Sequence, residues 1–237
     1  MVRRLQKTRG GWFGLIPLLC LGASFAGYLV AGPSLGLFFW GFFVLSFFVP
    51  AAVLAARDIK EALIRIASTT IAVGIIWLIA IWQTPDTLAQ WGELMLVLGS
   101  YGLAIGMIAL SAARTHMGLP LANSLAVVLG FAWLTCPLWL LPHVPRYSVG
   151  TTNFLVEVYP PLVANGVLTN EIPWTEKSMA YQLTSLNQDI PLDLTRRGWA
   201  CIAAHGGLGI VLLLFCARKR RPAAPVVMVK TVGHDFA

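Results

Sequence analysis

Charged residues are scarce in this sequence. Lys, Arg, Asp and Glu together make up 11% of the 237 residues, whereas hydrophobic residues make up 57%. Soluble domains carry about 25% charged residues, so this composition excludes an ordinary water-soluble protein. Six apolar stretches each hold roughly 20 residues, the length that crosses a bilayer core of about 30 Å. They are Trp12–Ala31, Leu35–Ala56, Leu63–Trp82, Leu94–Ala113, Leu121–Leu141 and Gly198–Cys216.

Catalytic and nucleotide-binding motifs are also missing. The chain has no G-x-x-x-x-G-K-[ST], no H-E-x-x-H and no G-x-S-x-G, and its apolar stretches hold no paired carboxylates. We therefore expect neither an enzyme nor a bound cofactor, and the chain cannot be its own P-loop ATPase. The weakest hypothesis is a membrane enzyme with a site in the segment between the last two stretches, where the candidates would be His143, Glu157, Glu171 and Asp189.

Metal-binding patterns are absent as well. The four cysteines lie within apolar stretches without C-x-x-C spacing, so we predict small buried apolar residues rather than ligands or a disulfide. They are Cys20, Cys136, Cys201 and Cys216. His205 lies well inside the last stretch, where an ionisable residue suggests a functional polar site. With no carboxylate at matching depth, we favour a neutral histidine hydrogen-bonded to a neighbouring helix.

The distribution of basic residues predicts an orientation. With the N-terminus in the cytoplasm, thirteen of the seventeen Lys and Arg residues fall on the cytoplasmic side, as the positive-inside rule requires. The other four lie in the long outer segment 143–197. The net charge of +7 is thus explained by orientation and by contact with anionic lipid headgroups, and we expect no nucleic-acid partner.

Together these patterns predict an all-α integral membrane protein of the plasma membrane, the inner membrane in a bacterium. Residues 1–216 would form one domain of six transmembrane helices with both termini cytoplasmic. Segment 143–197 would form a long outer cap loop between helices five and six, and the basic tail 217–237 would be disordered. The first stretch could be a cleaved signal peptide, but it exceeds the usual apolar core of about 7–15 residues, which favours an uncleaved helix.

The most densely charged segment before the tail is PAAVLAARDIKEALIRI, residues 50–66. Its charged residues are Arg57, Asp58, Lys60, Glu61 and Arg65. Apolar residues recur between them at helical spacing, so a short amphipathic helix can lie at the cytoplasmic interface. Glu61 can pair one turn away with Arg57 or Arg65, whereas Asp58 has no partner at that spacing. The competing interpretation is a helical extension that joins two spans and has solvated charges.

Several local patterns give further expectations. The second stretch is rich in aromatic residues and predicts a lipid-facing helix. The pair Gly102 and Gly106 has the G-x-x-x-G spacing of membrane helix dimers. Pro160-Pro161 can begin a short helix, which Asn165-Gly166 would interrupt with a turn. Glu93 lies at the mouth of the fourth stretch, as a solvated acid or facing an outer cavity.

The run FFVPAAVLAARDIKE resembles the end of the second span in membrane subunits of type-2 ATP-binding-cassette exporters. The similarity is carried by Pro50, Ala51, Ala52, Ala55, Ala56, Arg57, Asp58 and Glu61. Six spans, a cytoplasmic link after the second span and a large outer loop before the last also resemble that family. The resemblance implies that the charged link docks on a separate ATPase subunit. The sequence departs from the family where ALIRIASTT replaces its usual Thr-Leu-Leu-Pro stretch.

The leading hypothesis is therefore a permease-like subunit, a possible homodimer, energised by a separate ATPase through a coupling helix at Arg57–Arg65. The main rival is a non-catalytic accessory or scaffold subunit of a membrane protein complex. It explains equally well why the apolar stretches hold so few polar residues.

Overall fold

The structure, a computed structural model, describes residues 15–32, 35–82, 87–115, 117–136, 157–168 and 198–218. Within these residues all regular structure is helical, and no strand occurs. The helices are α2 (Ile16–Ala31), α3 (Leu35–Leu54), α4 (Ile59–Ile81), α5 (Thr87–Arg114), α6 (Leu119–Leu134), α9 (Pro160–Leu168) and α11 (Trp199–Arg218). The predicted all-α class is confirmed for this part of the chain.

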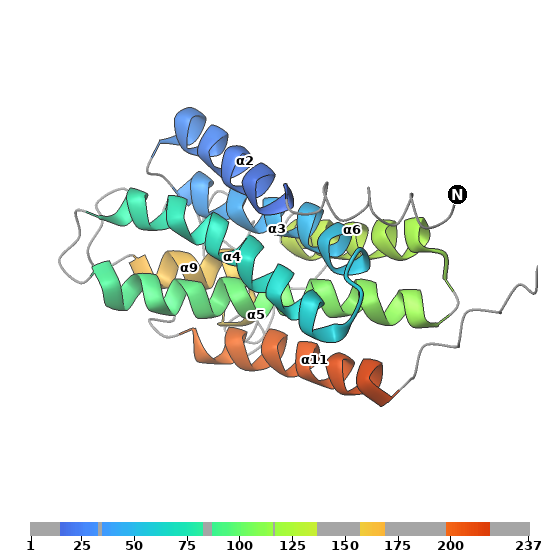
Figure 1. Cartoon of the computed structure of the whole chain (residues 1–237). Helices are drawn as coiled ribbons and strands as arrows, with labels where there is room; N and C mark the ends of the chain where they lie inside the picture. The colour runs from blue at the N-terminus through green and yellow to red at the C-terminus, as the bar shows by residue number, and fades with distance from the viewer. Residues whose placement is uncertain are drawn as a thin grey trace, which may run out of the picture.

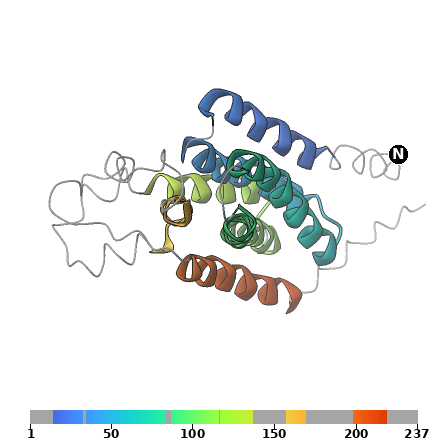
Figure 2. The same cartoon turned by 90° about the vertical axis from the view of Figure 1, so that its left-hand side faces the viewer.

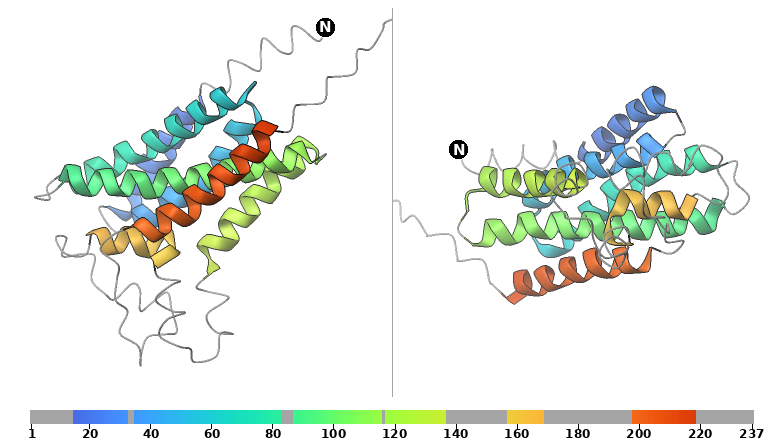
Figure 3. Two further views of the ribbon diagram at one scale, coloured as in Figure 1. Left: turned by 90° about the horizontal axis from the view of Figure 1, so that it is seen from below. Right: turned by 180° about the vertical axis from the view of Figure 1, so that it is seen from behind.

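The helices stack in layers around α5. Helix α2 lies on α3 and α4, which in turn lie on α5, and α11 covers the opposite side of α5 (Figures 1 and 2). Helices α6 and α9 both contact α3 and α5. The left view of Figure 3, taken from below, shows α11 crossing in front of α5 at the edge of the bundle. Helix α5 is therefore the central helix, with α2 and α11 at the two edges.

Four of the helices are long and apolar enough to cross a membrane. They cover Gly36–Leu54, Ile59–Ile81, Leu88–Arg114 and Trp199–Arg218. Two shorter apolar helices, Ile16–Ala31 and Leu119–Leu134, coincide with the predicted first and fifth spans. Of the remaining parts of those two predicted spans, residues 12–14 and 137–141 lie outside the described residues, and residues 15, 135 and 136 flank the two helices.

Close approach of the central helices depends on glycine. A Cβ added at Gly106 of α5 would lie 2.9 Å from Ile66 Cδ1, 3.0 Å from Val49 Cγ1 and 3.1 Å from Val53 Cγ2. One added at Gly209 of α11 would lie 2.6 Å from Leu103 Cγ. Gly106 therefore lets α5 pack tightly against α3 and α4 of the same chain. The G-x-x-x-G pair is used inside the chain and offers no dimer face of its own.

The prediction that the aromatic α3 faces lipid is wrong for two of its seven aromatic rings. Phe38 and Phe42 are fully buried, and both pack edge-on against the buried Trp77 of α4. Only Trp40 and Phe47 are among the exposed large hydrophobic residues of this helix. The reason is the position of α3, which contacts α2, α4, α5, α6 and α9 and so has little surface left.

Helix α9 begins at Pro160, as the proline pair predicts, but the predicted interruption at Asn165-Gly166 is wrong. The helix continues to Leu168. Its residues Leu162, Val163 and Val167 are buried, and the helix packs on α5 and α3. Burial of this apolar face outweighs the local turn preference of Asn-Gly, because propensity is a weak influence compared with tertiary packing.

The charged segment after α3 forms no separate interfacial helix. After a short turn, α4 begins at Ile59 and continues without a break for 23 residues. Lys60, Glu61 and Arg65 lie in its first two turns, while Ala62, Ile66 and Thr69 are buried on its other face. The same apolar spacing that favours an amphipathic helix continues into the span, so the segment is a helical extension. The other part of the competing interpretation, solvated charges, does not hold for Asp58, Glu61 and Arg65, which make hydrogen bonds or a salt bridge.

Candidate functional site

The turn between α3 and α4 is built around the end of α3. Near that end, Ala55 N donates to Ala51 O, and Ala56 N donates to Val53 O in a tighter i,i+3 bond. The Ala52 carbonyl between them instead accepts from Arg65 Nη1 at 3.1 Å. The last carbonyls of a helix need such outside donors, and a cation there also complements the negative end of the helix dipole. Arg65 thus caps α3 from α4.

The start of α4 is capped by two carboxylates. Asp58 is the N-cap residue with an extended backbone, and its Oδ1 accepts from Glu61 N at 2.7 Å. Glu61 Oε2 accepts from Arg57 N at 2.7 Å. This is a variant of the capping box, in which the two side chains satisfy backbone donors at the helix start. The predicted lack of an i,i+4 partner for Asp58 is correct, but Asp58 holds the backbone instead.

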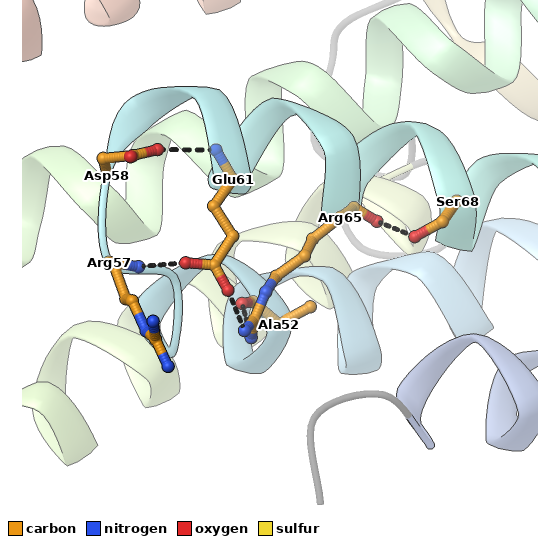
Figure 4. A network of polar contacts seen from close by, with 6 residues as sticks. All are labelled: Ala52, Arg57, Asp58, Glu61, Arg65 and Ser68. Carbon is orange, nitrogen blue, oxygen red and sulfur yellow. Dashed lines mark hydrogen bonds and ion pairs between the residues drawn. The ribbon is translucent and has the colours of Figure 1, made fainter. Parts of the chain in front are cut away.

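A salt bridge joins the two caps. Arg65 Nη2 donates to Glu61 Oε1, with the side chains 16% and 32% exposed. Figure 4 shows the resulting chain of contacts from Asp58 through Glu61 and Arg65 to Ala52. Because each cap also supports the other, the turn is internally fixed by the side chains of Asp58, Glu61 and Arg65.

The side chains of Arg57 and Lys60 have a different place. Both residues are exposed, and in Figure 4 the Arg57 guanidinium points away from the polar network. Of the five residues predicted to form a coupling surface, three hold the turn in shape and two present positive charge to the surroundings. The prediction gave all five residues one role, because a helix-capping side chain and an exposed charged side chain look alike in the sequence.

Basic residues gather at the same end of the bundle as this turn. All the Lys and Arg residues that the structure describes lie there, namely Arg57, Lys60, Arg65, Arg114 and Arg218. Arg114 Nη1 donates to Cys216 O and joins the ends of α5 and α11. Near the opposite end, Glu93 Oε1 accepts from Gly198 N at 2.6 Å. Glu93 is therefore not merely a solvated acid. Its carboxylate anchors the start of α11.

His205 lies where the sequence placed it, within α11, but its hydrogen bond differs from the prediction. Its Nδ1 is 2.9 Å from Cys201 O of its own helix rather than bonded to a neighbouring one. Because a carbonyl only accepts, Nδ1 carries the hydrogen. The ring is 8% exposed and packs against Tyr101 and Trp133 at centroid distances of 5.7 and 6.0 Å.

The structure locates all four cysteines but only some of the residues proposed for an enzyme site. All four cysteines are free and buried, as predicted. Among the described residues no group of three or more His, Cys, Asp or Glu side chains could hold a metal ion. Glu157 is half-buried just before α9. His143, Glu171 and Asp189, named for the enzyme hypothesis, lie outside the described residues.

A buried polar junction between three helices escaped the sequence analysis. Tyr101 of α5 is fully buried, and its hydroxyl lies 2.6 Å from Ser46 Oγ of α3 and 3.4 Å from Gly130 O of α6. Ser46 Oγ also donates to Phe42 O at 2.9 Å. A signal was present in the sequence, because Ser46 precedes Pro50 by one helical turn and Tyr101 interrupts an apolar, glycine-containing stretch.

Comparison with protein-family models, with curated proteins and with solved structures found no match. The class of the protein therefore follows from the fold alone. Four long apolar helices around a buried hydrophobic core identify a membrane-embedded, multi-pass α-helical protein.

Proposed function

We propose that this chain is a permease-like transmembrane subunit of an exporter of the ATP-binding-cassette type, energised by a separate ATPase subunit. The observation that carries the proposal is the α3–α4 turn. It is fixed internally by Asp58, Glu61 and Arg65 and presents the exposed Arg57 and Lys60. A preorganised charged turn can transmit force from a partner into two long helices, because it does not yield locally.

The proposed orientation places this turn in the cytoplasm of a bacterial cell, with six spans and both termini inside. The support is the gathering of the described basic residues at one end of the bundle, which the positive-inside rule associates with the cytoplasmic side. Helices α2 and α6 would complete the six spans together with residues beside them that lie outside the described ranges.

The direct test is purification of the chain in mild detergent from cells that express it at native level. The proposal expects a P-loop ATPase to co-purify in stoichiometric amount. The double variant R57E/K60E should lose that ATPase while its insertion and thermal stability stay at the wild-type level, because neither side chain supports the turn. The matched control is R218E, a charge reversal at an exposed residue of the same end. Recovery of no ATPase with the wild-type chain would contradict the proposal.

A second candidate is a non-transporting accessory or scaffold subunit of a membrane complex. One observation favours it: α11, an edge helix, exposes apolar residues along much of its length, including Leu208, Val211 and Leu214. The same purification separates the candidates, since a scaffold would bring down other membrane subunits without an ATPase. A homodimer, if it forms, must use a surface other than the buried Gly102 and Gly106.

A further inference from the structure

Pro50 leaves a gap in the hydrogen-bond ladder of α3. Proline has no amide hydrogen, so the carbonyl four residues earlier, that of Ser46, receives no helical bond from it. The helix nevertheless continues to Leu54. The final turn of α3, which leads directly to the charged turn, is therefore joined to the rest of the helix by a weakened ladder. Helices bend at such points.

Ser46 also makes a side-chain hydrogen bond from α3 to α5. Its hydroxyl makes a 2.6 Å hydrogen bond with the hydroxyl of Tyr101, and both residues are fully buried. The Tyr101 hydroxyl also lies 3.4 Å from Gly130 O of α6. A Cβ added at Gly130 would lie 3.0 Å from Ser46 Oγ. The three helices α3, α5 and α6 thus meet closely at these three residues.

This junction has fewer hydroxyl hydrogens than hydrogen-bonding contacts. Two hydroxyl hydrogens, one on Ser46 and one on Tyr101, serve three contacts. When Ser46 donates to Phe42 O, Tyr101 must donate to Ser46, and the contact with Gly130 O has no hydrogen. When Tyr101 donates to Gly130 O, Ser46 must donate to Tyr101. At 2.6 against 3.4 Å, this structure favours the first arrangement.

We propose that the Tyr101 hydroxyl is a relay between α3 and α6. Displacement of the charged turn opens the bend between Ser46 and Pro50, where the Ser46 carbonyl lacks its helical bond, and shifts Ser46 relative to Tyr101. The Tyr101 hydrogen bond then passes from Ser46 to Gly130 O. Movement at the end of α3 is thereby transmitted to a helix that follows much later in the chain. Tyr101 acts as a positioning residue. The inference rests on the proposed function in one respect, namely that the partner that displaces the turn is an ATPase subunit.

The test uses the purified full-length chain in lipid nanodiscs without any ATPase, so the result does not depend on the docking partner. The turn is perturbed with R65A, which removes the donor to Ala52 O. Amide hydrogen exchange is then measured in α6 around Gly130. The relay predicts that R65A changes α6 exchange several-fold in the wild-type background and leaves it unchanged in a Y101F background. Y101F keeps the ring packing and removes one hydroxyl.

Two further variants exclude a merely structural role. S46A leaves Gly130 O as the only acceptor at this junction for the Tyr101 hydroxyl. It should therefore slow α6 exchange below the wild-type rate and abolish the response to R65A. Y28F removes the hydroxyl of a tyrosine on α2, away from the junction, and should leave the response intact. An α6 response to R65A that persists in Y101F, or no response in the wild-type chain, would overturn the relay.

Discussion

At the scale of single residues, the charged turn shows how one side chain can decide where a helix begins. Asp58 has an extended backbone and accepts from Glu61 N at 2.7 Å. Replacing an N-cap aspartate by alanine costs about 1 kcal/mol. We expect D58A to lower the thermal stability of the detergent-purified chain accordingly, and D58N to stay close to wild type because Asn also caps. Equal stability of D58A and wild type would contradict the cap.

Gly106 gives a second residue-scale prediction, because its position leaves no room for a side chain. A Cβ there would lie within about 3 Å of Ile66, Val49 and Val53, and overpacking of this kind costs about 1–3 kcal/mol. We expect G106A to lower the midpoint of thermal unfolding. The matched control on the same helix is G92A, where nothing lies within 4 Å; there the gain in helix propensity should leave the midpoint unchanged or higher.

At the scale of elements, α11 is attached to α5 at both ends. Glu93 accepts from Gly198 N, and Arg114 donates to Cys216 O. Because the first bond joins the starts of the two helices and the second joins their ends, α5 and α11 run in the same direction.

Removing the Glu93 acceptor should loosen the first turn of α11. In E93A the Gly198 amide loses its partner, and a hydrogen bond to a charged group contributes about 1.5–3 kcal/mol. We expect faster amide exchange in the first turn of α11 and little change near Arg218. E93Q retains an acceptor and should exchange at an intermediate rate. Uniform acceleration along α11 would indicate that the bond has no local role.

At the scale of the whole molecule, the gathering of basic residues predicts the topology. Single cysteines at exposed positions of the two ends, K60C and L88C, can be introduced after the four buried native cysteines are replaced by alanine. Lys60 lies in the first turn of α4, and the 73% exposed Leu88 lies in the first turn of α5 at the other end. A membrane-impermeant maleimide should label L88C in right-side-out vesicles and K60C only in inverted ones. The reverse pattern would invert the orientation.

Hydrophobicity and helix-end signals predicted much of this fold. Every predicted apolar stretch coincides at least in part with a helix, and Pro160 marks the start of α9. The errors concern which neighbour each face meets. The aromatic composition of α3 predicted that Phe38 and Phe42 face lipid. They are buried because α3 is surrounded by other helices. Likewise, the contact between Ser46 and Tyr101 spans 55 residues of sequence. Each residue stands out in its own apolar stretch, but no local pattern indicates that the two are paired.

The attachment of α11 also has a consequence for biogenesis. The bond from Gly198 to Glu93 spans 105 residues and that from Arg114 to Cys216 spans 102. In a nascent chain synthesised only as far as α9, the side of α5 that packs against Gly209 of α11 is still uncovered. The part of the bundle that the structure describes is therefore complete only once α11 has been inserted beside α5, which makes the placement of α11 the closing step of its assembly.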